Sequence, residues 1–275
     1  MNVDAVKLDV VLYNQVQMLL SQRAVLLPTI SDYSSLVEEG ANSVDIPRLS
    51  AGVARDMLFD GNENINSGMG IAVDTLLFGA FKEVPEFIYD DKRSQTRADL
   101  DAYFMETSPV VMSDTIEQAV YAELKLASAA APDNRLPLTV AAPTFDEITA
   151  AQVRLDEENV PQEDRYLACT PAMKSKLLKI QEVKDASLRM DQSVVIKGQF
   201  SEVAGFKFVV TNNATADEIL CYHKSALAFA LKRSVPFVKE RQESKNRDYL
   251  SLKANYGQKV LDGGKRVVLL NATGA

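Results

Sequence analysis

The most constraining feature of the sequence is a run of turn-forming residues between two strand-like segments. Residues 60–70 read DGNENINSGMG, with three glycines and three asparagines but only Ile65 and Met69 as sizeable apolar side chains. The flanking segments, 53–59 and 71–78, are rich in apolar residues, as strands are. Because residues 60–70 have so little to bury, the sequence predicts the tip of a long, exposed β-hairpin there.

The strongest helical pattern lies in the middle of the chain. Apolar residues recur at helical spacing between Ile116 and Ala127. Asp114, with Glu117 three residues later, fits a capping box at the first turn. The sequence therefore predicts a long amphipathic helix over 114–130.

A shorter helix and a strand-to-helix unit follow. Thr144 and Glu147 form a second capping box, which predicts a helix over 144–158. Residues 165–169 then read as a strand that leads into Thr170–Pro171, a cap residue followed by proline at the first helical position.

The remaining chain offers short strand signals separated by turns. Strands are expected at 44–46, 86–89, 194–196, 206–211 and 219–222, a helical segment at 225–232 and a closing β-hairpin at 259–270. Helices and strands are thus segregated rather than regularly alternating, which indicates an α+β fold.

Composition and motifs exclude several classes of protein. The apolar share of 47% and the charged share of 25% are typical of an ordinary globular chain, and no apolar stretch approaches the roughly 18 residues of a membrane-spanning helix. Cys169 and Cys221 lie in apolar stretches, which predicts two buried, reduced thiols. Gly68 and Gly70 begin like a dinucleotide loop, but Val73 stands where its third glycine belongs.

Few residues remain as candidates for chemistry. His223 is the one histidine, and because no orienting carboxylate is evident we expect a structural or surface role. The acidic pairs at 90–91, 99–101 and 157–158 are expected to be solvated or to face helix ends. The sequence therefore predicts no catalytic residue, no metal site and no cofactor.

Charge is unevenly distributed along the chain. Residues 223–275 hold 11 Lys and Arg against 4 Asp and Glu, a charge of +7, which leaves -15 (19 against 34) for residues 1–222. Either the charges lie on separate solvated faces, or acidic regions of one copy meet basic regions of another.

The order of elements resembles the major capsid proteins of tailed bacteriophages, which have the Hong Kong 97-type fold. The likeness is best in the second half of the chain. The segments that carry it are Phe145-Asp146-Glu147-Ile148, Asn159-Val160-Pro161, Arg165-Tyr166-Leu167, Gly198, Ala204-Gly205-Phe206, Thr211-Asn212-Asn213, His223-Lys224-Ser225-Ala226 and Tyr256-Gly257.

The resemblance implies a division into four parts. These are an N-terminal arm over 1–43, an extended hairpin loop over 44–92, a peripheral domain with the long helix over 93–142 and 233–275, and an α/β axial domain over 143–232. It also implies that the hairpin tip contacts neighbouring subunits. The tip residues are Asp60, Gly61, Asn62, Glu63, Asn64, Asn66 and Gly68.

The resemblance further implies a structural subunit, not an enzyme. Copies would assemble into hexamers and pentamers of an icosahedral phage head around double-stranded DNA, in the bacterial host cytoplasm, and remain in the virion. A portal protein, weak non-specific DNA contact and no membrane are expected. The chain starts directly in the arm, so a separate scaffolding protein is implied. An encapsulin-like nanocompartment shell and a motif-poor α+β enzyme are the alternatives.

Overall fold

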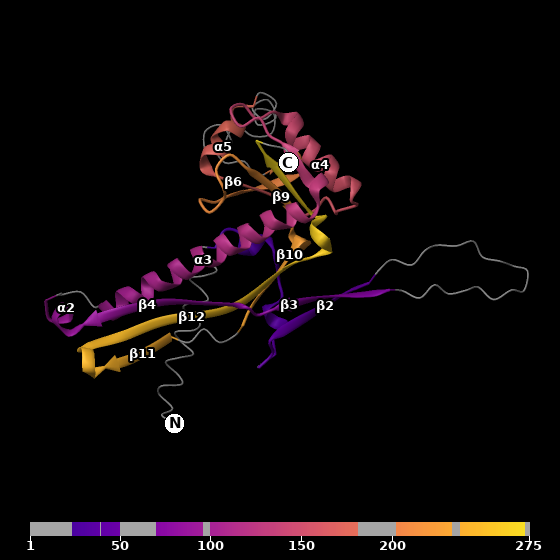
Figure 1. Cartoon of the computed structure of the whole chain (residues 1–275). Helices are drawn as coiled ribbons and strands as arrows, with labels where there is room; N and C mark the ends of the chain where they lie inside the picture. The colour runs from indigo at the N-terminus through magenta and orange to yellow at the C-terminus, as the bar shows by residue number, and fades with distance from the viewer. Residues whose placement is uncertain are drawn as a thin grey trace, which may run out of the picture.

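Two sheets share one long helix. A computed structural model describes residues 24–38, 40–49, 70–95, 100–180, 202–232 and 237–272. The long helix, α3, covers Leu100–Ala130. A long sheet lies along it, a second layered unit lies at its C-terminal end, and a hairpin projects from the junction between them (Figure 1).

The first sheet is built around β12, a strand of 14 residues. The strands of this five-stranded sheet are β1 (Ser31–Asp32), β4 (Ala80–Tyr89), β10 (Leu227–Leu231), β11 (Phe237–Gln242) and β12 (Arg247–Val260). β12 pairs antiparallel with β4, β10 and β11, whereas β1 is parallel to β10. The short helix α2 (Asp90–Gln95) follows β4 at the end of the sheet farthest from the second sheet (Figure 1).

The second sheet is covered on both faces. Its six strands are β5 (Arg135–Pro137), β6 (Arg165–Cys169), β7 (Glu202–Val203), β8 (Phe206–Val210), β9 (Ile219–His223) and β13 (Val267–Asn271). Along β9, Leu220 and Tyr222 join the cluster around α3, while Ile219 and Cys221 join the cluster under α4 (Phe145–Glu157) and α5 (Pro171–Leu177). Burial on both faces explains why this strand is continuously apolar.

Short 3-10 turns join many of these elements. They are η1 (Leu27–Thr29), η2 (Ser34–Leu36), η3 (Pro132–Asn134), η4 (Lys224–Ala226), η5 (Glu243–Lys245) and η6 (Asp262–Gly264). Two of them, η4 and η6, lie where the chain passes between the two sheets.

The predicted strands at 44–46 and 71–78 are confirmed, and they form the stem of a hairpin. β2 (Ser43–Leu49) pairs antiparallel with β3 (Ile71–Leu77), with Ser43 opposite Leu77 and Leu49 opposite Ile71. The predicted strands at 53–59 and 194–196 and the tip residues 60–68 lie outside the described residues. The strand expected at 86–89 is the end of the longer β4.

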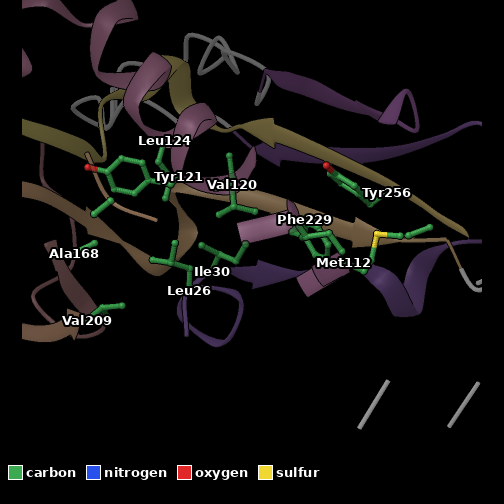
Figure 2. Packing of buried hydrophobic residues seen from close by; sticks show 14 of the residues in the cluster. Leu26, Ile30, Met112, Val120, Tyr121, Leu124, Ala168, Val209, Phe229 and Tyr256 are labelled. Atoms are coloured by element: carbon green, nitrogen blue, oxygen red, sulfur yellow. The ribbon is translucent and has the colours of Figure 1, made fainter. Parts of the chain in front are cut away.

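The main core surrounds α3 (Figure 2). Met112, Val120 and Leu124 of the helix are at most 1% exposed. They share one cluster with Phe229 and Tyr256 of the first sheet, Ala168 and Val209 of the second, and Leu26 and Ile30 of the N-terminal segment 24–38, for which the name arm is kept. A single helix therefore stabilises both sheets and the end of the arm.

The helix begins at Leu100, so the predicted start at Asp114 is wrong. Pro109 lies inside the helix, where proline costs about 3 kcal/mol because it removes a hydrogen bond and crowds the preceding turn. Phe104 and Met112, on the turns before and after it, are 5% and 1% exposed. Burial of both flanking turns offsets the cost, and the sequence pattern does not show it.

The capping role predicted for Glu117 is also wrong, because this residue lies in mid-helix and contacts the arm. Its side chain is buried, with the residue 3% exposed. Its Oε1 accepts the backbone N–H of Leu26 at 2.8 Å and that of Val25, and its Oε2 accepts the Asn213 amide at 3.3 Å. The carboxylate thus satisfies two backbone donors where the arm meets α3.

The capping box of α4 and the β6-to-α5 unit are confirmed. Glu147 accepts the backbone N–H of Thr144 at 2.9 Å. Thr170 Oγ1 accepts the N–H of Met173 at 3.2 Å, with Pro171 in the first turn of α5. These local signals are correct because they need only residues within one turn of each other.

The helical prediction for 225–232 is wrong. After η4, residues Leu227–Leu231 form β10. A short apolar run fits a buried helix or a buried strand equally well, and pairing with β1 and β12 on its two sides makes it a strand.

The closing hairpin at 259–270 is wrong as well. Gly263 and Gly264 adopt φ angles of 62° and 83° within η6, and the chain passes from β12 in the first sheet to β13 in the second. A Cβ atom at Gly264 would collide with the backbone of Ala127. The two glycines therefore let the chain turn against the end of α3 instead of folding back on β12.

Strand pairing crosses the four ranges expected from the sequence. β4, within 44–92, pairs along its length with β12. β10, within 143–232, lies in the first sheet, and β13, within 233–275, lies in the second. Pairing partners far apart in the chain decide which sheet a strand joins.

Removing the Glu117 carboxylate should weaken the arm attachment. Glu117→Leu leaves the N–H groups of Val25 and Leu26 without their acceptor, at a cost of about 2 to 4 kcal/mol. Glu117→Gln keeps an oxygen that can accept these N–H groups, so its loss of unfolding free energy should be less than half that of Glu117→Leu. Urea unfolding measures both variants, and equal losses would contradict the proposed role of the acceptor.

Candidate intersubunit surfaces

The outward face of the hairpin stem exposes several large apolar side chains, next to the polar Asp45 and Thr75. Side chains of β2 and β3 alternate between two faces, and Ile71, Val73 and Leu77 on the outward face are 66%, 53% and 66% exposed. Pro47, opposite Val73, is exposed on the same face. Several large apolar side chains exposed together on one projecting element are typical of an interaction surface.

The inward face of the stem attaches it to the body of the subunit. Val44, Ile46 and Leu76 are buried, in a cluster with Ala228 and Ala230 of β10. The alternation gives the stem one face that packs on its own subunit and one that does not.

A close backbone contact fixes the angle of the stem. A Cβ atom at Gly257 of β12 would lie 2.5 Å from Leu76 Cδ2 and 2.6 Å from the Leu77 carbonyl oxygen. Only glycine allows β12 and β3 to approach so closely. Gly257 belongs to the Tyr256-Gly257 pair of the sequence resemblance, which gave no reason for the glycine.

A chain of polar side chains, here called the junction chain, crosses from the second sheet to the hairpin stem. Its members are His223, Ser225, Arg266, Asp262, Arg48 and Asp74. His223 Nδ1 lies 2.7 Å from Ser225 Oγ, to which Arg266 donates. At the other end, Arg48 Nε lies 2.6 Å from Asp74 Oδ2. His223 lies close to Ser225 in the sequence, and Asp262 to Arg266, but no spacing in the sequence brings these two pairs together with Arg48 and Asp74.

A second group, the distal ion cluster, lies at the α2 end of the first sheet. Its members are Asp90, Arg93, Asp101, Lys239, Arg241 and Asp248. Asp248 is 5% exposed and accepts from Arg93 at 2.7 Å and from Arg241 at 3.1 Å. The Arg241 guanidinium, followed by that of Arg93, holds the pKa of Asp248 below its ordinary value, although partial burial acts in the opposite direction.

The surface of the first sheet facing away from α3 carries aromatic side chains. The Arg247 guanidinium carbon lies 3.7 Å from the centre of the Phe87 ring, and the Phe87 and Tyr249 rings are 5.3 Å apart. Phe81, further along β4, is 74% exposed. The Arg247 contact covers part of Phe87, whereas Phe81 stays open.

Part of the charge asymmetry is neutralised within one subunit. Lys239 pairs with Asp101 at 2.6 Å and Arg241 with Asp90 at 2.5 Å. Each pair joins the basic C-terminal part to the acidic earlier part. The complementarity of the two parts therefore does not by itself require a second copy.

The structure also bears on metal binding, membrane spans, the cysteines and the histidine. Within the described ranges, no three His, Cys, Asp or Glu side chains lie together as a metal site would require. None of the helices described is both long and apolar enough to span a bilayer. Cys169 and Cys221 are buried, as predicted, and burial raises the pKa of the Cys169 thiol to about 12. His223 caps η4 through the Ser225 N–H, a structural role.

A long helix beside a long sheet, an α/β layer at its end and a projecting hairpin define the Hong Kong 97-type class of capsid proteins. A family model described as phage capsid protein matches residues 111–272, more than half of the chain. The chain therefore belongs to the phage capsid protein family and is a structural major capsid protein.

Solved structures share the fold at low sequence identity. A chain of Mycobacterium phage Che8 is 22% identical, with 92% of both chains covered and a TM-score of 0.74. A chain of the capsid of cyanophage P-SCSP1u is 17% identical, with 88% of this chain and 86% of that chain covered and a TM-score of 0.70. A virus-like particle from Pyrococcus furiosus is 12% identical, with 96% of this chain and 99% of that chain covered, and the TM-score is lower, at 0.59. No curated protein sequence matches the chain significantly. Because the family model and the phage structures both match, the nanocompartment alternative is not favoured.

Substitution at Gly257 should disturb the hairpin rather than the core. In Gly257→Val the new side chain collides with the Leu77 backbone, so β3 must move. We expect faster hydrogen exchange in β2 and β3, with α4 exchanging as in the native chain. Unchanged exchange in the stem would show that the contact does not fix its angle.

Asp248→Asn should destabilise the chain near neutral pH by about 1 to 2 kcal/mol, because two charge-assisted hydrogen bonds are weakened while the arginines remain partly solvated. The depressed pKa of Asp248 means that its contribution is present above its unfolded pKa, near 4, and is lost as the pH falls through the folded value.

Urea unfolding at pH 7 and pH 2.5 measures this effect. The difference between Asp248→Asn and the native chain should shrink at the lower pH. Asp91→Asn, on the neighbouring exposed turn of α2, is the control and should change stability by less than about 0.5 kcal/mol. A difference that is constant with pH would contradict the role of the carboxylate charge.

Proposed function

We propose that this chain forms the hexamers and pentamers of an icosahedral phage head that encloses double-stranded DNA. Assembly would take place in the bacterial host cytoplasm, with a separate scaffolding protein and a portal protein as partners. The DNA contact would be weak and independent of sequence. Membership of the phage capsid protein family supports this proposal.

The observation that carries the proposal is the set of large apolar side chains exposed on the outward face of the hairpin stem. Ile71, Val73 and Leu77 together leave a large apolar area in water, and burying each would contribute about 1 to 2 kcal/mol. Within the described residues, no element of the same subunit covers them. A neighbouring copy in a ring presents the same surfaces at a fixed rotation, and such contacts close a capsomer.

We also propose a functional division of the subunit. The first sheet with α3 would form the peripheral domain, and the second sheet with α4 and α5 the axial domain. The hairpin loop would reach from the stem, β2 and β3, to its tip at 60–68 and contact the adjacent subunit there. The division at the junction is supported by the two separate sheets.

Polar substitutions on the outward face of the stem should prevent assembly without unfolding the subunit. In Ile71→Ser/Val73→Ser, both changed side chains are already more than half exposed, so the melting temperature should shift little. Negative-stain microscopy and light scattering should show loss of shells or rings.

Val153→Ser on α4 is the matched control. Val153 is 54% exposed and Val73 53%, so the control loses a comparable exposed group away from the hairpin and should assemble normally. Normal assembly of the double variant would contradict the proposal. Shells of the native chain with a protein cargo and no DNA, or a stable 30.3 kDa monomer that turns over a metabolite, would favour the alternatives.

A further inference from the structure

The single histidine of the chain lies at one end of the junction chain. His223 is the last residue of β9, and no other histidine occurs among the 275 residues. Its Nδ1 accepts the backbone N–H of Ser225 at 3.1 Å and lies 2.7 Å from Ser225 Oγ. Accepting that N–H requires an unprotonated Nδ1, so the cap of η4 depends on the protonation state of the ring.

Ser225 connects the histidine to the hairpin stem. Arg266 donates to Ser225 Oγ and pairs with Asp262. Asp262 also pairs with Arg48 of β2. The side chains of these ion pairs are between 18% and 34% exposed. They are therefore partly shielded from water. The four residues are Arg48, Asp74, Asp262 and Arg266.

Several positive charges lie around His223, and they disfavour protonation of its ring. Arg165 lies opposite His223 on β6, Arg266 lies beside it through the Ser225 link, and Lys224 follows it in the chain. Asp164 and a hydrogen bond to the Glu163 backbone act in the opposite direction and raise the pKa of His223, although Asp164 also pairs with Lys207 at 2.8 Å. Burial, and after it Arg266, holds the pKa of His223 below its ordinary value.

We propose that His223 is an acid-responsive switch for the hairpin, in which proton uptake at Nδ1 breaks the η4 cap and loosens the ion pairs that hold the stem. The proton is the ligand, and the stem of β2 and β3 is the element that responds. The inference concerns the single subunit and goes beyond shell building. Because the folded-state pKa is the lower one, the stabilisation is complete above the unfolded pKa of about 6.5 and declines as the pH falls below it.

Hydrogen exchange of the full chain between pH 7.5 and 5.0, corrected for the intrinsic pH dependence of exchange, tests the proposal. Protection of β2 and β3 should fall by about tenfold while α4 stays protected. The lower limit lies above the ordinary carboxylate range, so the distal ion cluster stays ionised. The ring-proton signal of the single histidine gives its titration midpoint directly, and the loss of protection should follow that midpoint.

His223→Asn is the decisive variant. Asparagine is a strong N-cap whose side chain can accept the Ser225 N–H but does not titrate in this range, so protection of the stem should no longer depend on pH. If this variant fails to fold, Ser225→Ala serves instead: it retains the titrating ring but removes the Oγ link to Arg266, and should also abolish the pH dependence.

Three results would overturn the proposal. The first is a native stem whose protection does not change between pH 7.5 and 5.0. The second is an unaltered pH response in His223→Asn or Ser225→Ala. The third is a stem transition whose midpoint differs from the histidine midpoint by more than about one pH unit, since one titrating group would then not account for both. All samples are compared in the same state of assembly.

Discussion

Packing of α3 against both sheets is the interaction on which the rest of the structure depends. Side chains from both sheets and from the arm enter one cluster around this helix (Figure 2). The cluster explains how the helix tolerates Pro109. Glu117 is buried beside this cluster, where the backbone of Leu26 contacts α3. With α3 fixed, the positions of the two sheets follow, and the hairpin projects from the place where they meet (Figure 1).

The hairpin stem is held by three kinds of contact that act together. An apolar cluster provides most of the burial, the Gly257 backbone contact sets the distance between β12 and β3, and the junction chain adds directional ion pairs. The first two do not depend on pH, whereas the third does. A capsid subunit built in this way keeps its hairpin attached while the attachment remains adjustable, which suits a surface that must meet a neighbouring copy.

Sequence reasoning succeeded where the signal is local. The capping box at Thr144 and the Thr170–Pro171 start of α5 need only neighbouring residues, and the strand signals at 44–46 and 71–78 fall on the two strands of the hairpin stem. It failed where the outcome depends on distant partners. Leu227–Leu231 is compatible with helix or strand until two strands pair with it, and Gly263 and Gly264 suit a tight hairpin until Ala127 of α3 is placed against them.

By itself the sequence determined the α+β class, the family resemblance, strand signals within both strands of the hairpin stem and the absence of recognisable catalytic motifs. Only the tertiary structure decided where α3 begins, which sheet each strand joins, and how Arg48, Asp262, Arg266 and His223 form one chain of contacts. The physical reason is range. Capping and turn chemistry act over a few residues, whereas burial and strand pairing join residues far apart in the sequence, and their free energy outweighs local preference.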